Sequence, residues 1–457
     1  MDEPEKLLST RHPTLAWPRI PNNQTLIVLT LYDQLERAEH MPAEEIVRAQ
    51  MAQLRPLLDH AVSHVPYYRE RLADSYKAGA RPLTMDGFRR LPVLTRRNLQ
   101  EAGSRLNSES PIREHGAIAT VRSSGSTGQP VAVKTNSLNQ MFQRAIDLRY
   151  HVWNRRDFRA SVGSITKLSA KEAEAAKANR ADPWVPGYLS GPARYFDIGQ
   201  PVEDQLSWLV ENDFDYVMTY PSNLMNLLKK SAETGARLPN LKEVWARSEV
   251  VSQEIRDECR RVWKVPISET YSAQELGIVA LQCPDGGGFH VMAEHFIVEI
   301  VDDDGAPCAA GQSGRVLVTN LHNFVTPLIR YEIGDFAEAG APCACGRTLP
   351  KFNRILGRVR NMLVLPDGRR IWPSFGTRSF HEIAPVRQHQ IVQTAHDHVE
   401  IRIVPVRPFT ADETARLGEH VRARLPEGIS VSVTFHDEIE RSAGGKFEDF
   451  MSLVDAP

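Results

Sequence analysis

Apolar residues in the first half of the chain recur mainly at the spacing of helices. Between residues 42 and 74, the positions that share this spacing are Ile46, Met51, Leu54, Leu57, Leu58, Ala61 and Val62. The pattern predicts an amphipathic helix, and Pro66 disfavours its continuation. Residues 91–95 are expected to be extended and to lead into another helix. The Ala-, Lys- and Glu-rich stretch 171–180 predicts a solvated helix, and residues 206–233 predict two helical stretches flanking a strand at 216–220.

The pattern changes to alternation in the middle of the chain. Phe296, Val298 and Ile300 alternate with other residues before an Asp-rich turn at 302–305, and further strands are expected at 315–319 and around 327–331. Successive strands joined by turns predict an antiparallel meander.

The last hundred residues have a character of their own. A strand is expected at 398–404, then a helix at 412–425 that a Thr410–Glu413 capping box would begin, then a strand at 429–435. A tail of this size and pattern is that of a small α+β domain. We place the domain boundary near residues 357–360.

Composition excludes several function classes. The chain has 457 residues, 42% hydrophobic and 25% charged, with a formal net charge of −2, so no global basic field favours nucleic acid or an anionic membrane. No apolar run is long enough to cross a bilayer. The short apolar run at 25–32 is read as an N-terminal core or edge segment rather than a signal peptide. Five cysteines do not make a disulfide framework in a chain of this length, so a cytoplasmic location is expected.

The strongest local signal is a loop rich in glycine and hydroxyl groups. Its small residues are Ser123, Ser124, Gly125, Ser126, Thr127 and Gly128. The glycines let backbone N–H groups approach an anion, and the hydroxyls add donors, which suits a triphosphate. The loop is not the GxxxxGK[ST] phosphate loop, because no Lys-Ser/Thr follows its last glycine. Taken alone, such a stretch is more often a flexible connection.

Four further motifs follow in order. They are Tyr-Ser-Ala-Gln-Glu-Leu-Gly at 271–277, Pro-Leu-Ile-Arg-Tyr-Glu-Ile-Gly-Asp at 327–335, Cys-Ala-Cys-Gly-Arg at 343–347 and a Gly-Lys pair that ends at Lys446. With the loop, they resemble the phenylacetate–CoA ligase-like family of the adenylate-forming superfamily, over residues from about 50 to 450. The resemblance implies a large α/β adenylation core, residues 1–357, which binds ATP and the acid. It also implies a small mobile α+β C-terminal lid, residues 358–457, which carries the catalytic lysine.

The resemblance also assigns roles to individual residues. The loop from Ser123 to Gly128 would hold the β- and γ-phosphates, and Glu275 would help to bind Mg²⁺. Ser248 and Glu249 would line the adenine pocket, and Tyr271 would pack against the base. Asp335 would accept hydrogen bonds from the ribose with help from Arg358, and Lys446 would reach the acyl carboxylate and α-phosphate. Each also has a structural alternative, such as a helix-start carboxylate for Glu275, a turn cap for Asp335 or a tail lysine for Lys446.

Two residues depart from the family pattern. Gln274 stands where a threonine is expected to bind the α-phosphate, and Ser272 stands where a glycine is expected. The glutamine amide donates hydrogen bonds but is longer and broader than threonine. The hinge sequence also lacks the usual acidic residue after Gly357-Arg358. These departures bear on the substrate class and the second half-reaction more than on adenylation.

A possible metal site is separate from these motifs. Cys283 and His290, together with Cys343 and Cys345, make the Cys₃His set that structural Zn²⁺ prefers. A metal held by them would staple the ends of the antiparallel segment. The alternative is that the cysteines are reduced and packed in loops, with His290 at the surface. Cys259 and Cys308 are read as structural.

The expected reaction joins a small carboxylic acid to AMP and then to coenzyme A, and the resemblance implies an aromatic acid. An amine acceptor or a separate carrier-protein thiol stays open, as does a homodimer. A non-catalytic adenylate-binding protein is the rival of a different class, and the presence of Glu275, Asp335 and Lys446 argues against it. No basic-aromatic patch indicates nucleic-acid binding.

Overall fold

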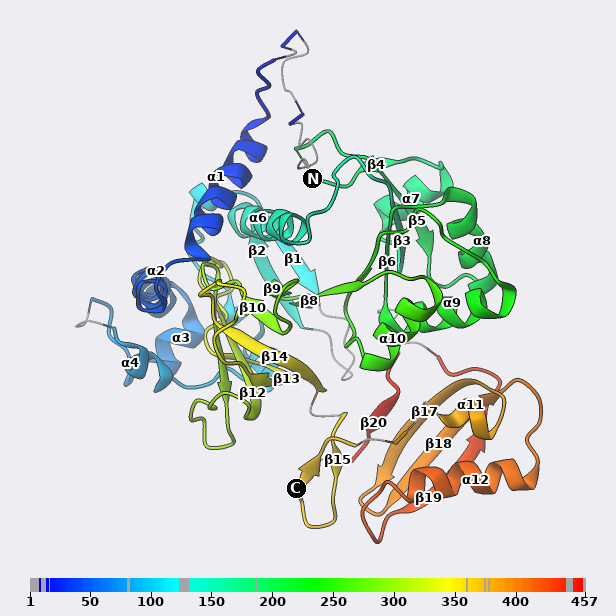
Figure 1. Ribbon diagram of the computed structural model, residues 1–457. Helices are drawn as coiled ribbons and strands as arrows, with labels where there is room; N and C mark the ends of the chain where they lie inside the picture. The colour runs from blue at the N-terminus through cyan, green and yellow to red at the C-terminus, as the bar shows by residue number, and fades with distance from the viewer. Residues whose placement is uncertain are drawn as a thin grey trace. The chain divides into compact units, whose positions relative to one another are not determined.

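The computed structural model (Figure 1) divides the chain into two compact units, residues 1–355 and 356–457. It describes all residues except 1–7, 10–13, 16, 80–82, 123–130, 186, 359–360, 374, 377–378, 441–446 and 455–457. Each unit has its own buried apolar core. The expected fold, a large α/β domain with a small α+β C-terminal domain, is confirmed.

The first unit begins with helices. They are α1 (Asn23–Ala38), α2 (Ala43–His64), α3 (Pro66–Arg71), α4 (Met85–Arg89) and α5 (Arg96–Ala102), with two short 3₁₀ turns (Gly103–Leu106 and Arg113–His115). The apolar run at 25–32 lies within α1, where Thr25 and Val28 are buried but Leu26 and Ile27 are largely exposed. Pro66 ends α2 as expected and then takes the first position of α3, where its missing N–H costs nothing.

The strands β1 (Ile118–Arg122) and β2 (Ala132–Asn136) form a hairpin and lead into α6 (Ser137–Trp153). The hairpin brackets the hydroxyl- and glycine-rich loop, which itself lies outside the described residues. Asn136 caps α6 by accepting a hydrogen bond from the Asn139 N–H. The start of α6 is therefore fixed directly after the hairpin.

A twelve-stranded sheet spans the first unit, in the order β11-β12-β13-β14-β10-β9-β8-β7-β6-β3-β5-β4. The strands on the parallel side are β3 (Val162–Thr166), β4 (Asp182–Pro183), β5 (Pro192–Asp197), β6 (Tyr216–Thr219), β7 (Glu243–Ala246) and β8 (Ile267–Ala273). Except for the β4–β5 pair, neighbours on this side run parallel. The helices between them are α7 (Ala170–Lys177), α8 (Val202–Asn212), α9 (Pro221–Thr234) and α10 (Gln253–Val262). This half is a βαβ arrangement with its own apolar core.

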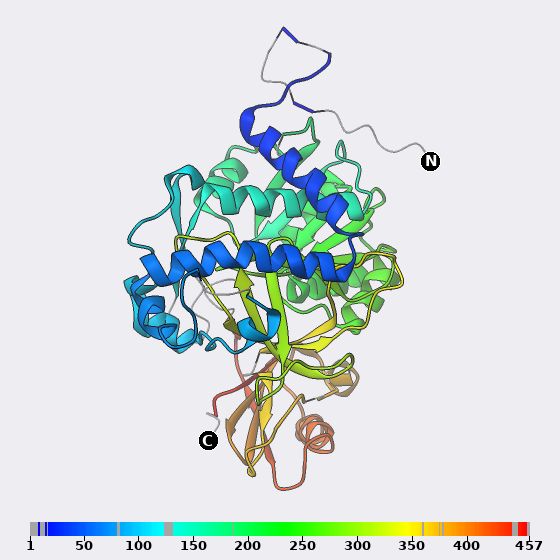
Figure 2. The same cartoon turned by 90° about the vertical axis from the view of Figure 1, so that its left-hand side faces the viewer.

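The other side of the sheet is antiparallel. Its strands are β9 (Gly277–Gln282), β10 (Phe289–Val291), β11 (Phe296–Val301), β12 (Ser313–Asn320), β13 (Tyr331–Ala339) and β14 (Lys351–Arg358). The long helix α2 packs on this side (Figure 2). Its Gln50 side chain donates hydrogen bonds to the carbonyls of Ala293 and Phe296. The meander is confirmed, but the strand expected around residues 327–331 is wrong, because β13 begins only at Tyr331. Arg330 has a φ of +48°, which a strand does not allow.

The second unit is a four-stranded sheet in the order β19-β18-β17-β20. The elements of this unit are β15 (Leu363–Val364), β16 (Arg370–Ile371), α11 (Phe380–Ile383), β17 (Val386–Ala395), β18 (His398–Pro405), α12 (Ala411–Arg422), β19 (Ser430–Phe435) and β20 (Phe450–Ser452). Leu417 and Val421 of α12 are buried in one core with Ile401 and Ile403. The Thr410–Glu413 capping box begins α12 as predicted. Among the described helices of both units, none is long and apolar enough to cross a membrane.

Candidate nucleotide site and metal centre

The β8–β9 hairpin lies where the parallel and antiparallel sides of the sheet meet. β8 pairs in parallel with β7 and antiparallel with β9, so the turn between β8 and β9 carries Gln274 and Glu275. Gln143 of α6 closes the hairpin, because its amide donates to the Leu276 carbonyl (3.2 Å) and accepts from the Ile278 N–H (2.7 Å). Gly277 has a φ of +81°, and a Cβ there would lie 2.4 Å from the Gln143 side chain. Only glycine fits this turn without displacing Gln143.

Two hydroxyl–carboxylate hydrogen bonds connect this hairpin to β13. The Tyr271 hydroxyl donates to Asp335 Oδ2 at 2.8 Å, and the Tyr331 hydroxyl donates to Glu275 Oε1 at 3.1 Å. Tyr271 and Tyr331 are buried, whereas both carboxylates are partly exposed. Burial raises the pKa of Tyr331, and the neighbouring Glu275 raises it further, so its hydroxyl stays protonated and donates. Asp335 and Glu275 are therefore each oriented by a tyrosine.

The segment after β7 holds the other residues assigned to the nucleotide in the first unit. Ser248 has a φ of +71°, an unusual conformation for a serine. Glu249 accepts hydrogen bonds from the Ser222 N–H (2.9 Å) and hydroxyl (3.1 Å), at the start of α9. Gln274 is exposed. The strand ends of β6, β7 and β8 thus bring 222, 248–249 and 271–275 to one edge of the sheet, where α/β proteins bind ligands.

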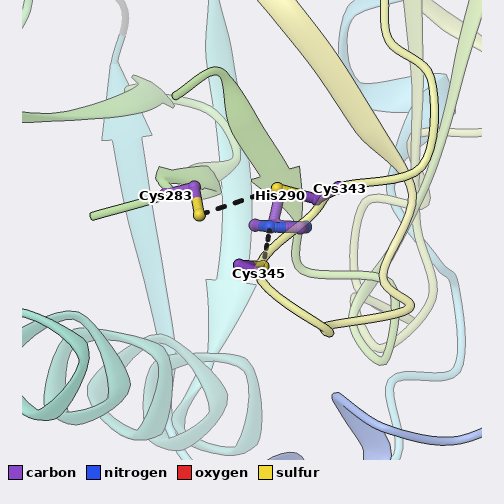
Figure 3. A group of neighbouring side chains, drawn as sticks. All are labelled: Cys283, His290, Cys343 and Cys345. Atoms are coloured by element: carbon purple, nitrogen blue, oxygen red, sulfur yellow. Dashed lines mark hydrogen bonds between the residues drawn. The ribbon is translucent and has the colours of Figure 1, made fainter. Parts of the chain in front are cut away.

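A second cluster joins the four residues of the possible metal site (Figure 3). Cys283 follows β9, His290 lies in β10, and Cys343 and Cys345 lie in the loop between β13 and β14, with all four ligand atoms within 4.8 Å of one another. The Cys283 and Cys343 sulfurs are 3.8 Å apart, and Cys345 Sγ lies 3.3 Å from His290 Nε2. A tetrahedral Zn²⁺ with bonds of about 2.3 Å to sulfur separates two sulfur ligands by roughly 3.8 Å. The donor set and its spacing therefore fit zinc.

Surrounding groups fix these donors in place. His290 is fully buried, not at the surface, and its Nδ1 lies 3.3 Å from the Leu349 carbonyl, which turns Nε2 toward the sulfurs. Backbone N–H groups of Gly286 and Arg347 donate to Cys283 (3.2 Å) and Cys345 (3.4 Å). Burial raises the pKa of Cys283 to about 11. Burial also acts to raise the pKa of Cys345, but the Arg347 N–H and neighbouring thiols outweigh it and lower that pKa.

Comparison with known proteins agrees with these motifs. Residues 363–452 match the model of the CapK C-terminal domain. The phenylacetate–coenzyme A ligase of Thermus thermophilus is 24% identical over 91% of this chain and 98% of its own length, and that of Escherichia coli is 25% identical over 89% and 93%. The chain resembles the phenylacetate–CoA ligase-like family along most of its length. It is an adenylate-forming ligase of the acid–thiol class.

Solved structures share the fold of this ligase. A 2-hydroxyisobutyryl-CoA ligase in the postadenylation state is 20% identical, with a TM-score of 0.68 and 91% of both chains covered. An anthranilate CoA ligase in complex with anthranoyl-AMP is 16% identical, with a TM-score of 0.52 over 73% of this chain and 66% of its own.

The ligase motifs differ in how far the structure places them. It brings Tyr271 to Asp335 and shows hydrogen bonds from Tyr331 to Glu275 and from Ser222 to Glu249. Arg358 belongs to the second unit, where its N–H donates to the Asn361 side chain at 3.1 Å. Residues 123–128 and Lys446 lie outside the described residues. The roles of all these residues stay predictions.

Sequence reasoning missed two residues of this ligase site. Tyr331 lies in the 327–335 motif, four residues before Asp335, and this position is the signal that could have identified it. Gln143 gave no signal, because a glutamine in a polar helix is ordinarily solvated, and only the fold places it on the hairpin.

Proposed function

We propose that the chain activates a small carboxylic acid with ATP and transfers the acyl group to coenzyme A. An oxygen of the acid would attack the α-phosphorus, the bond from that phosphorus to the bridging oxygen would break, and pyrophosphate would leave with the electron pair. The thiol sulfur of coenzyme A would then attack the acyl carbon, AMP would leave, and the thiol proton would be lost to solvent. An aromatic acid is proposed from the names of the relatives.

One observation carries the proposal, namely the pair of tyrosine–carboxylate hydrogen bonds that links Tyr271 and Glu275 of the β8–β9 hairpin to Asp335 and Tyr331 of β13. Asp335 there would accept from ribose hydroxyls. Glu275 is suited to Mg²⁺, a hard cation that usually takes only one or two carboxylates beside phosphate oxygens. The loop 123–128 would bind the phosphates, and Lys446, carried by the lid of residues 358–457, would stabilise charge at the α-phosphate. Lys446 and a Mg²⁺ held by Glu275 would stabilise the charge that develops in the transition state more than the charge of the bound substrate.

The Cys/His cluster is assigned a separate, structural role. We propose that it holds one Zn²⁺, because four protein donors leave no open position for a substrate. The metal would fasten the 343–345 loop to β9 and β10, away from the chemistry assigned to Glu275 and Asp335.

ATP–pyrophosphate exchange tests the activity. Purified protein would be incubated with aromatic, arylacetic and amino-substituted acids, each with and without coenzyme A. Exchange that depends on one acid would establish adenylation, and thioester formed on adding coenzyme A would establish the acceptor. Adenylate that persists with coenzyme A, but is consumed by an amine or a carrier thiol, would correct the acceptor. Exchange with no acid would contradict the proposal.

The same assay on Asp335→Asn tests the role proposed for this carboxylate. The amide keeps the size of the side chain but accepts fewer hydrogen bonds, so we expect at least about tenfold slower exchange at low ATP. Asp367→Asn, which changes an exposed carboxylate paired with Arg369 in the second unit, is expected to leave exchange unchanged.

A further inference from the structure

Arg247 stands at the carboxyl end of strand β7. It directly follows Ala246, the last residue of the strand, and its N–H donates to the Thr219 carbonyl of β6 at 3.3 Å. The backbone then turns through Ser248, whose φ is +71°. The Arg247 side chain is exposed, and its guanidinium makes no hydrogen bond or ion pair with any part of the chain that the structure describes. Ligands of α/β proteins bind at this edge of the sheet.

Other arginines of the parallel half of the sheet are paired with carboxylates. Arg156 bonds to both oxygens of Glu243, the first residue of β7, at 2.8 Å each. Arg256 of α10 pairs with Glu269 of β8. Arg247, at the other end of β7, is the cation on this strand that a ligand of opposite charge can reach, and a guanidinium binds a carboxylate strongly through parallel N–H donors.

The Arg247 side chain lies on the face of the sheet that α6 covers. Side chains alternate along a strand, so Arg247 shares the face of Trp245, two residues earlier. The Trp245 ring centroid lies 5.2 Å from that of His151 in α6. Asp147 of α6 is within electrostatic reach of Arg247, but its contact is with His151, at 3.4 Å. No ion pair joins Asp147 to Arg247, both of which the structure describes.

A row of side chains from three strands lies on the same face. Ser164, Met218 and Trp245 are neighbours across β3, β6 and β7, and we call them the β3–β7 row. Trp245 packs against Tyr216 and Trp184 at centroid distances of 5.3 and 5.4 Å. Met218 and Trp184 are only partly buried, so solvent reaches part of this surface.

Ser164 adds a polar group to this row. It is 1% exposed, and its hydroxyl oxygen has no hydrogen-bond partner in the described structure. Few buried polar groups lack a partner. The face therefore combines an aromatic and apolar surface with an unpaired hydroxyl and a cation at its rim, which is the composition of a small-molecule site.

We propose that the acid activated by this enzyme carries a second carboxylate, which Arg247 binds while the body of the acid lies along the β3–β7 row. This inference rests on the proposed function. Ser248 and Glu249, assigned to the adenine pocket, directly follow Arg247, so a group held by Arg247 lies beside the adenylate. One carboxylate of the acid joins AMP and the other stays ionised against the guanidinium, whose planar fork matches its two oxygens.

Matched acids test this specificity in the full chain by acid-dependent ATP–pyrophosphate exchange. The panel holds phenylacetic acid, its ortho, meta and para carboxy derivatives, and each derivative with the ring carboxyl blocked as a methyl ester. Pentanoic acid and glutaric acid form an aliphatic pair. We expect a diacid to have a kcat/KM at least about tenfold above that of its monoacid and its ester, the effect of a hydrogen bond between charged groups.

Variants of Arg247 assign the preference to this residue. Arg247→Ala should lower kcat/KM for the preferred diacid by about 10–100-fold and leave the monoacid unchanged. Arg247→Glu should reverse the preference, so that an amino derivative of phenylacetic acid reacts faster than the carboxy derivative. Arg159→Ala is the matched control, because Arg159 is exposed and pairs with Asp157 before the amino end of β3. It should keep the wild-type preference.

The outcomes separate this inference from the proposed function. Wild-type protein that shows exchange with no acid would overturn both. Exchange that is as fast with the monoacid or the ester as with the diacid would overturn only the inference. So would a diacid preference that survives in Arg247→Ala, or an equal loss for diacid and monoacid, which is the result of a purely structural role. Arg247→Gln, which keeps the length and polarity without the charge, gives the same decision if the alanine variant does not fold.

Discussion

His295, which is fully buried, and His322, which is partly buried, form a pair of neutral imidazoles in the first unit. Their Nδ1 atoms are 2.9 Å apart, so one ring donates and the other accepts. Phe142 stacks on both rings at centroid distances of 4.9 and 4.0 Å. Burial, with a smaller contribution from nearby His115, lowers the pKa of His322 to about 4. Burial also lowers the pKa of His295 well below its usual value, with a smaller contribution from His322.

We expect this pair to make the protein sensitive to acid. A histidine has a pKa of about 6.5 in the unfolded chain, so between pH 6.5 and 4 the unfolded state binds more protons than the folded state. Stability therefore falls as the pH drops through this window, by roughly 3 kcal/mol from His322 alone at pH 4. Urea unfolding at pH 7, 6, 5 and 4 measures the slope.

His322→Gln should flatten this slope even if it lowers stability at neutral pH. The exposed His396 supplies a control, because His396→Gln should keep the wild-type slope. An equally steep loss of stability in His322→Gln would assign the acid sensitivity to other groups.

At the scale of elements, Gln143 links α6 to the β8–β9 hairpin. α6 directly follows the β1–β2 hairpin, so this one amide connects the framework of the proposed phosphate loop with the turn that carries Glu275. Gln143→Ala removes both hydrogen bonds and leaves the Ile278 N–H and Leu276 carbonyl without this partner. We expect about 1–3 kcal/mol lower stability and a reduced kcat for exchange.

Neighbouring Arg144 is the matched control for Gln143. It is exposed and contacts Gln24, so Arg144→Ala should change neither property. Thermal unfolding and exchange kinetics on both variants check the prediction. A Gln143→Ala protein with wild-type kcat would show that the hairpin keeps its shape without the amide.

The Cys/His cluster joins the end of β9, strand β10 and the loop between β13 and β14. If it holds zinc, purified protein should contain about one equivalent of the metal, measured by mass spectrometry of the element. Removal of the metal by a strong chelator should lower the melting temperature by several degrees, because the free energy of metal binding stabilises the folded state. Cys343→Ser should lose both the metal and this stability.

Cys308 provides the comparison within the same chain. It is partly exposed and lies outside the cluster, so Cys308→Ser should retain zinc and its melting temperature. Metal-free protein with full stability would identify the four residues as packed thiols and a buried imidazole.

Sequence patterns predicted most elements because each has a local cause. The capping box at Thr410 and the break at Pro66 act within a few residues, and the structure has both. Residues 327–331 were mistaken for a strand because Leu328 and Ile329 are apolar, whereas the tertiary contacts of Arg330 with Glu299, Arg89 and Leu91 hold that segment irregular. The hydrogen bond from Tyr331 to Glu275 joins residues 56 positions apart, so no local pattern could reveal it.

At the scale of the whole molecule, the proposed reaction divides between the two units. The first unit holds Tyr271, Glu275 and Asp335, while residues 358–457 would supply Lys446. Adenylation needs a cation where charge moves between the acid and the α-phosphate, but thioester formation from finished adenylate does not form that bond. The two half-reactions should therefore depend differently on the lysine.

Lys446→Ala is expected to slow acid-dependent exchange by about 100-fold or more, the effect of removing a donor aimed at developing charge. Thioester formation from chemically prepared acyl-adenylate and coenzyme A should stay near the wild-type rate, using the acid that the exchange assay identifies. Arg422→Ala, on the exposed face of α12, should leave both half-reactions unchanged. If Lys446→Ala turned over normally, the lysine would have no part in adenylation. If Lys446→Ala lowered the rates of both half-reactions equally, the substitution would act through the overall structure of residues 358–457. Only a group placed at the acid and α-phosphate is expected to slow adenylation and leave thioester formation unchanged.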